Sequence, residues 1–146
     1  MTGHDSKRYG ADEEVEEVGR RFESGELPPD EFKHREHLVV ALLYLLRHPP
    51  AEARERMRRG IHAFLRAHGE DPAPVYHETL TAFWIRRVGS FAARAGRRRP
   101  LHELANELCA ECGAARLVFE YYSKALVDTD AARRGWVEPD LKALDF

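Results

Sequence analysis

Apolar residues along this chain recur at intervals of three and four positions, which is the spacing of one face of an α-helix. Between residues 75 and 94 the apolar stripe consists of Leu80, Trp84, Val88 and Phe91. A similar stripe in residues 51–67 includes Met57, Ile61 and Phe64. The alternating pattern of a half-buried β-strand does not occur anywhere in the sequence. The pattern therefore predicts an all-α fold, a helical bundle of five or six helices.

One segment, residues 30–47, differs from the other predicted helices because it has no polar side in its second half. Every residue from Leu38 to Leu46 is apolar or aromatic. A helix that is apolar all round is buried, so we expect this helix to run through the middle of the bundle. Asp30 is the predicted N-cap, and the prolines after His48 end the helix.

The remaining elements follow from the same pattern and from glycine and proline signals. Residues 1–11 are polar and patternless, so they are predicted to be a disordered lead-in to a single helical domain at 12–146. Gly25 is expected to end the first helix in a left-handed conformation. The tail is predicted to be extended and to lay Trp136 and Leu141 on the bundle. The other helices are predicted at 12–24, 51–67, 75–94, 101–112 and 114–127, with a further turn or two near 128–135.

Composition narrows the class of protein. The 146 residues include 23 Lys and Arg against 25 Asp and Glu, so no charge excess favours nucleic acid or a membrane surface. There is no apolar run of eighteen residues and no apolar export segment near the start, which predicts a soluble, cytoplasmic protein. Cys109 and Cys112 are the only cysteines, as expected in a reducing compartment.

Three histidines are the main candidates for chemistry. His34 and His37 are three residues apart and share one face of the central helix, and His77 begins the stripe of the 75–94 helix. If these two helices run parallel, their starts meet and three imidazoles converge. Three histidines are the minimum set for a catalytic metal with one open coordination position. We therefore expect a divalent metal ion, zinc or iron, bound by His34, His37 and His77.

The residues around His77 add possible acid, base and hydrogen-bonding groups. Glu78 is expected either as a fourth metal ligand or as the acid or base beside a bound water. Tyr76 and Thr81 flank the same opening and could donate hydrogen bonds to a substrate. The alternative is that the sequence Tyr-His-Glu-Thr, residues 76–79, is only the capped first turn of a helix.

Other motifs are weaker. His102 begins a sequence similar to the H-E-x-x-H zinc motif, but the second histidine is absent. The C-x-x-C of Cys109 and Cys112 has no second pair, which favours small core residues over a zinc or redox site. The arginines of the 94–99 loop, with Arg86 and Arg87, lack interleaved aromatic residues, so a solvated loop is favoured over RNA binding.

The sequence also resembles a widespread group of small bacterial all-helical proteins, to which no activity can be assigned. The shared elements are F-x-H-x-x-H-L at residues 32–38, Y-H-E-T-[LI]-T at 76–81 and W-[VI]-x-P-D-L at 136–141. This resemblance sets apart the same His34, His37, His77 and Glu78. DinB-like bacterial bundles, which place three histidines around one metal, are a more distant analogy at the level of the fold.

Three functions are compatible with these features. The leading hypothesis is a metal-dependent enzyme acting on a small-molecule substrate, as a hydrolase or lyase with zinc or an oxidoreductase with non-haem iron. The first alternative is a non-enzymatic helical module that binds a small ligand. The second alternative is an RNA- or protein-interaction bundle. No nucleic-acid or membrane partner is expected for the leading hypothesis, and the chain is expected to be a monomer or a homodimer.

Overall fold

The computed structural model describes residues 8–96 and 99–146, and every regular element in these two ranges is helical. The all-α prediction is therefore confirmed. The described ranges contain eight α-helices and two 3-10 helices, more than the five or six helices predicted, because several short turns lie between the longer helices. No helix in the described part of the chain is long and apolar enough to cross a membrane.

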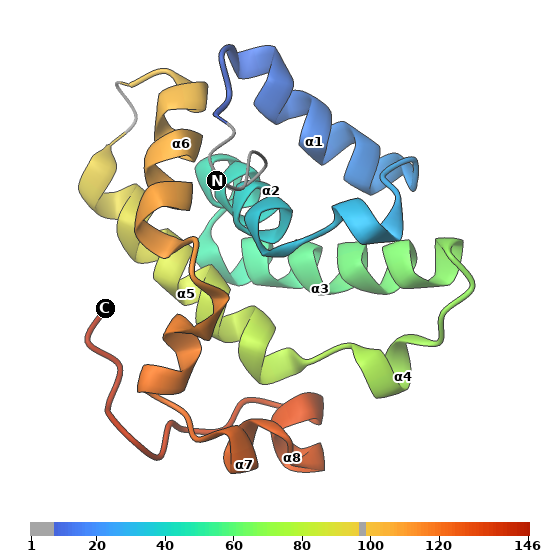
Figure 1. Ribbon diagram of the computed structural model, residues 1–146, viewed down its shortest axis with the longest axis vertical. Helices are drawn as coiled ribbons and strands as arrows, with labels where there is room; N and C mark the ends of the chain where they lie inside the picture. Colours follow the sequence, from blue (N-terminus) through green and yellow to red (C-terminus); the bar gives the residue numbers. More distant parts are fainter. Residues whose placement is uncertain (1–7, 97–98) are drawn as a thin grey trace, which may run out of the picture.

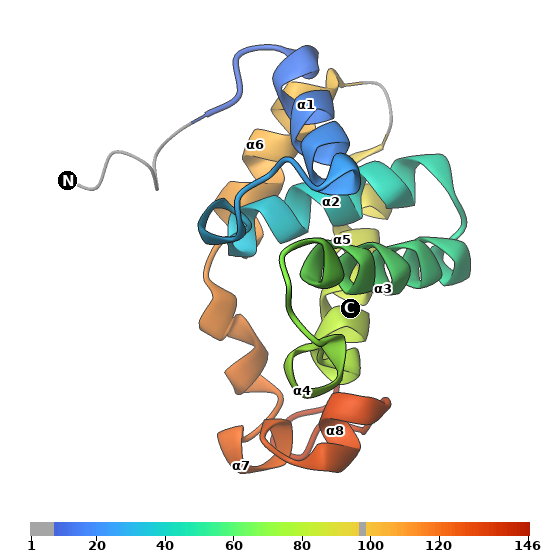
Figure 2. The same cartoon turned by 90° about the vertical axis from the view of Figure 1, so that its right-hand side faces the viewer.

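The central helix, α2 (His34–Arg47), is surrounded by the other long helices (Figures 1 and 2). All residues from Leu38 to Leu45 are buried, as the continuous apolar run predicts. Each of the four helices that pack against α2 buries its own apolar face there. They are α1 (Asp12–Ser24), α3 (Pro50–Ala67), α5 (Glu78–Ala95) and α6 (Leu101–Cys112).

The start of the central helix differs from the prediction. Asp30 does not cap α2 but lies in a short 3-10 helix, η2 (Pro29–Glu31). The residue before α2 is Lys33, and its backbone N–H donates to the carboxylate of Glu36 at 3.0 Å. The side chain of Glu36 thus satisfies a backbone donor at the helix start, so α2 begins after Lys33 and not after Asp30.

The chain after α6 forms a second, smaller hydrophobic cluster beside the first half of α5. A continuous helix at 114–127 was predicted, but this segment is divided into η3 (Ala115–Glu120) and α7 (Lys124–Val127). The hydroxyl of Ser123 accepts from the N–H of Leu126 at 3.1 Å and so starts a new helix. The buried members of this cluster are Phe83, Val118, Tyr121, Tyr122 and Val127.

The last residues close over this cluster after α8 (Asp130–Arg134). Leu141 was predicted to pack on the bundle, but its side chain is 58% exposed. Phe146 supplies the apolar contact in its place, with its ring 5.4 Å from that of Phe83 and 5.5 Å from that of Tyr121. Trp136 is half-buried and packs against the cluster, as predicted.

A buried threonine joins α5 to this C-terminal segment. The hydroxyl of Thr79 donates to the carbonyl of Gly135 at 2.6 Å and accepts from the N–H of Val137 at 3.2 Å. Because Thr79 is fully buried, its hydroxyl depends on these two backbone groups for its hydrogen bonds. This pair of bonds holds the segment that follows α8 against the start of α5.

Of the predicted lead-in, residues 1–7 lie outside the described residues. Tyr9 is buried against the bundle, where Asn106 of α6 holds its backbone with two hydrogen bonds of 2.8 and 2.9 Å. The guanidinium of Arg35 lies 4.3 Å above the Tyr9 ring. Tyr9 is thus fixed to α6 and to α2.

Candidate functional site

The two histidines of α2 hydrogen-bond to separate backbone carbonyls. The Nε2 atom of His34 lies 2.9 Å from the carbonyl oxygen of Cys112, and the Nδ1 atom of His37 lies 2.8 Å from that of Lys33. Burial lowers the pKa of both imidazoles below the ordinary range for histidine. Both rings are therefore neutral at pH 7.

The third predicted histidine, His77, lies just before α5 and caps it. Its Nδ1 atom accepts from the N–H of Leu80 at 3.1 Å, and its Nε2 atom donates to the carbonyl of Val127 at 2.8 Å. The hydroxyl of Thr81 bonds back to the carbonyl of His77 at 2.9 Å. His77 thus has the geometry of a helix cap, in keeping with the alternative considered from the sequence, a capped first turn at residues 76–79.

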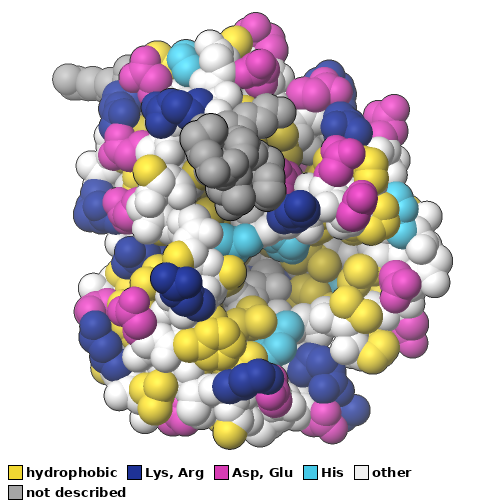
Figure 3. All heavy atoms as spheres, in the orientation of Figure 1, with side chains coloured by type: hydrophobic (Ala, Val, Ile, Leu, Met, Phe, Trp, Pro, Cys, Tyr) yellow, Lys and Arg dark blue, Asp and Glu magenta, His cyan; other side chains and the backbone are white. Residues whose placement is uncertain are grey.

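The metal site is not formed by these three imidazoles as they are arranged. Among residues 8–96 and 99–146, no group of three or more His, Cys, Asp or Glu side chains is placed to hold a metal ion. Histidine side chains do gather around a hollow in the face seen in Figure 3. However, both ring nitrogens of His77 are already hydrogen-bonded, so metal binding would require it to release one partner. The metal centre stays a prediction, which elemental analysis of the purified protein tests.

Two of the predicted site residues, Tyr76 and Glu78, come together in a different place. They line a cavity of about 430 Å³ between α3, the short helix α4 (Pro72–Val75), the start of α5 and α8. We call this cavity the arginine pocket. Its lining consists of Arg54, Arg58, His62, Pro72, Ala73, Tyr76, Glu78, Arg133, Arg134, Gly135 and Trp136.

Glu78 is the single carboxylate of the arginine pocket and is only 7% exposed. One of its oxygens, Oε2, accepts from Nε and Nη2 of Arg54 at 3.1 and 2.7 Å. The other oxygen, Oε1, accepts from the hydroxyl of Tyr76 at 2.7 Å. Burial raises the pKa of Tyr76 above its ordinary range, so this hydroxyl keeps its proton at pH 7. Glu78 is thus neutralised and held in place by its two neighbours.

The arginines exceed the carboxylates in the pocket lining by four to one. Arg58 pairs with Glu55 at 2.9 Å and Arg133 pairs with Asp130 at 2.7 Å, both outside the lining. Arg134 makes no ion pair with any residue in the described ranges. Among the lining arginines, Arg134 is therefore the one whose charge has no partner in the described ranges, and it gives the cavity an excess of positive charge.

Three nitrogen atoms of the lining are buried without a hydrogen-bond partner among the described residues. These atoms are Nε of Arg58, Nε2 of His62 and Nε of Arg133. Nε of Arg58 makes only a 3.4 Å ion-pair contact with Glu78. Burial, helped by the charges of Arg66 and Arg58, lowers the pKa of His62, so its ring is neutral at pH 7. Because these three atoms are closed off by protein atoms, a molecule in the cavity would instead contact the accessible parts of the Arg58 and Arg133 side chains, which are 42% and 25% exposed.

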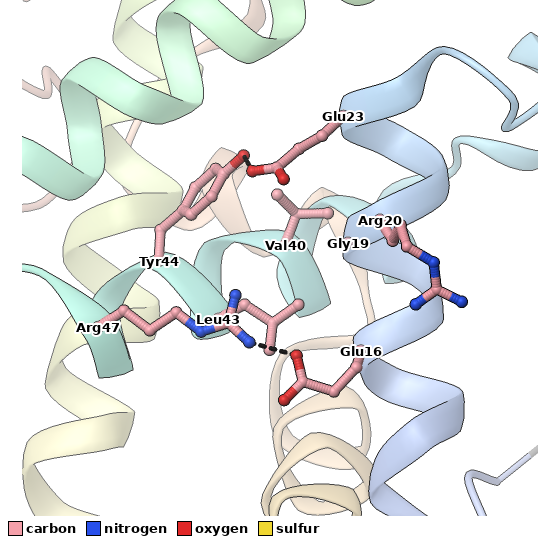
Figure 4. Close-up of a pocket in the computed structure, with 8 residues that line it drawn as sticks. All are labelled: Glu16, Gly19, Arg20, Glu23, Val40, Leu43, Tyr44 and Arg47. Atoms are coloured by element: carbon pink, nitrogen blue, oxygen red, sulfur yellow. Dashed lines mark hydrogen bonds and ion pairs between the residues drawn. The ribbon is translucent and has the colours of Figure 1, made fainter.

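A second cavity, of about 300 Å³, lies between α1 and α2 (Figure 4). Two pairs of its polar and charged groups are directed at one another, whereas Arg20 pairs with Glu17 outside the lining. The hydroxyl of Tyr44 donates to Glu23 at 2.6 Å, and Arg47 pairs with Glu16 across the groove. With its acidic and basic groups already matched, this groove has no charge excess for a ligand. The arginine pocket is the stronger candidate site.

The sequence analysis did not identify most of the arginine pocket, although one signal was present. Arg54, Arg58 and His62 are spaced by four residues and therefore lie on one face of α3. A helix face with arginines at this spacing is also typical of an ordinary solvated surface, so the spacing alone does not predict a cavity. Arg133, Arg134 and Trp136 have no such signal, because only the tertiary structure brings them against α3.

The weaker sequence motifs have other partners. Both the backbone N–H and Nδ1 of His102 bond to Asp12, at 2.9 and 2.7 Å, which ties α6 to the start of α1. Cys109 and Cys112 are free thiols, and burial raises the pKa of both. In the arginine loop, residues 97–98 lie outside the described residues, and Arg94 pairs with Glu111 at 2.7 Å.

Comparison of the chain with known protein families, with curated proteins and with solved structures found no match. The resemblance to the group of small bacterial helical proteins therefore stays a prediction. The function proposed below is therefore inferred from the residues that line the arginine pocket.

Proposed function

We propose that this protein is a helical module that binds a small organic anion in the arginine pocket. The observation that carries the proposal is the gathering of four arginines from α3 and α8 around one cavity that holds a single carboxylate. Arg134 has no ion-pair partner in the described ranges. A negatively charged ligand would supply this missing countercharge and accept hydrogen bonds from the guanidinium groups.

The size and shape of the cavity favour a small molecule over a nucleic acid. At about 430 Å³ the pocket falls within the range of cavities that enclose small ligands. A nucleic-acid surface would instead need cationic groups spread along a face. Described arginines outside the pocket, such as Arg87, Arg94 and Arg99, pair with glutamates of α6. Their charge is thus partly compensated within the protein.

The proposal can be tested by calorimetric titration of the purified protein with a panel of small anions and neutral analogues. Acetate, succinate, benzoate, inorganic phosphate and phenyl phosphate are suitable anions, and benzyl alcohol is a neutral control. We expect at least one organic anion to bind and the neutral compound not to bind. A bound ligand at 100 times its dissociation constant adds about 2.7 kcal/mol to the free energy of unfolding, so thermal melting gives an independent measurement.

A pair of charge-matched variants separates specific binding from general electrostatic attraction. Arg134→Gln removes a cation of the pocket, and Arg116→Gln removes an exposed arginine of η3 that is not in the lining. A charge-assisted hydrogen bond contributes about 1.5–3 kcal/mol, so Arg134→Gln should weaken binding by about tenfold or more. Arg116→Gln should bind like the parent protein. Equal weakening by both variants, or no binding of any anion to the parent, would contradict the proposal.

A further inference from the structure

The free donors of the arginine pocket come from separate side chains on two helices. Arg58 lies on α3, and Arg133 and Arg134 approach the same cavity from α8. The guanidinium of Arg54 is already occupied, because its Nε and Nη2 both bind Glu78. The guanidinium of Arg134 has no ion-pair partner among the described residues. A ligand in the cavity would therefore be surrounded by donors from both helices.

This arrangement distinguishes between classes of anion. A carboxylate is flat, has two oxygens, and is bound best by two parallel N–H groups of one arginine. A phosphate group presents three oxygens in a tetrahedral arrangement, so it can accept from several side chains that surround it. It also carries close to two negative charges at pH 7, which suits a lining of four arginines and one carboxylate.

We propose that the arginine pocket recognises the phosphate group of a phosphate monoester through Arg58, His62, Arg133 and Arg134. The proposal rests on the proposed function and specifies its ligand class. The imidazole of His62 is neutral at pH 7, so it can donate one hydrogen bond to the ligand but adds no charge. Arg54 and Tyr76 do not contact the phosphate but hold Glu78, so that its carboxylate does not repel the ligand.

The rest of the lining suits the organic part of such an ester. Pro72 and Ala73 of α4 and the half-buried indole of Trp136 form the less polar side of the cavity. The indole N–H of Trp136 donates to the carboxylate of Glu138 at 2.6 Å, which fixes the orientation of the ring. A ligand with a phosphate and an apolar or planar group would thus contact both sides, whereas inorganic phosphate would contact only the cationic side.

Three aromatic anions that differ in their charged group provide the test, again by calorimetric titration. Phenyl phosphate, phenyl sulfate and benzoate share a ring, but only the phosphate becomes a dianion, as its second proton leaves near pH 6. At pH 7.5 we expect phenyl phosphate to bind at least tenfold more tightly than either other compound, and more tightly than inorganic phosphate. At pH 5 the phosphate is a monoanion, and its advantage over phenyl sulfate should disappear.

The titratable and charged groups that face the ligand are His62, Glu78, Tyr76 and the arginines of α3 and α8. Protonation of His62 at low pH would strengthen binding of all three anions, so the ratio between phosphate and sulfate is the decisive quantity. Tight binding of benzoate or phenyl sulfate at pH 7.5 would overturn the phosphate assignment and leave the proposed function intact. Binding of none of these anions would overturn both.

A charge-preserving variant tests the role of the directed donor. Arg58→Lys keeps the positive charge but removes the guanidinium and its fixed donor geometry, and we expect at least fivefold weaker binding of phenyl phosphate. Arg59→Lys is the matched control, because Arg59 is exposed on the same helix and is not part of the lining. If Arg58→Lys binds phenyl phosphate as tightly as Arg59→Lys does, Arg58 contributes only charge and the directed recognition is wrong.

Discussion

Glu78 is the residue whose replacement tests most directly how the arginine pocket is built. Its side chain is 9% exposed and accepts two hydrogen bonds from Arg54 and one from Tyr76. Glu78→Gln keeps the shape but removes the charge and directs an amide N–H₂ group at groups that are themselves donors. Breaking a fully buried ion pair costs about 3–5 kcal/mol. The side chain of Arg54 is 37% exposed and can turn toward water, so a smaller loss of about 2–3 kcal/mol is expected.

Urea unfolding followed by circular dichroism measures this loss in the free energy of unfolding. In a thermal melt, the same loss lowers the melting temperature of a domain of this size by roughly 5–10 °C. Glu111→Gln is the control, because Glu111 also contacts two arginines, Arg94 at 2.7 Å and Arg87 at 3.8 Å, but is 32% exposed. The control should lose less than about 1 kcal/mol. If Glu78→Gln loses no more stability than Glu111→Gln, the burial of Glu78 does not strengthen its pairing with Arg54. The expected loss of about 2–3 kcal/mol is then wrong.

Two further predictions concern the packing and the tyrosines. Gly60→Ala places a methyl group 2.8 Å from the ring of Phe22 and should destabilise the protein by about 1–3 kcal/mol. In Gly89→Ala the nearest contact of the new methyl group is at 3.7 Å, so this variant should instead be more stable by about 0.5–1 kcal/mol. Urea midpoints of the two variants test this, and equal shifts would refute it. Burial raises the pKa of Tyr122 from 10.0 to about 12, so its contribution to stability is fully present below pH 10 and is lost as the pH rises toward 12. The urea midpoint should therefore fall over that range, and Tyr122→Phe should remove part of the fall; an identical fall in the variant would contradict the assignment.

The sequence by itself determined the fold class and the centre of the bundle. The run from Leu38 to Leu46 has no polar side, and burial is the only way for such a helix to avoid exposing apolar surface, whatever surrounds it. The sequence also predicted that Gly25 ends the first helix, and its φ of 81° is the left-handed conformation expected there. These are local properties, and they require no knowledge of which elements meet.

The candidate site depends on contacts between residues far apart in the chain, and only the tertiary structure decided it. For the segment 76–81, helical spacing could not tell that His77 would bond to Val127 while Glu78 paired with Arg54. Adjacent side chains on a helix diverge by about 100°, so neighbours in sequence face different surroundings. Which of them enters a cavity is decided by how α3, α5 and α8 pack against one another, and that packing is not encoded in any single stretch of the sequence.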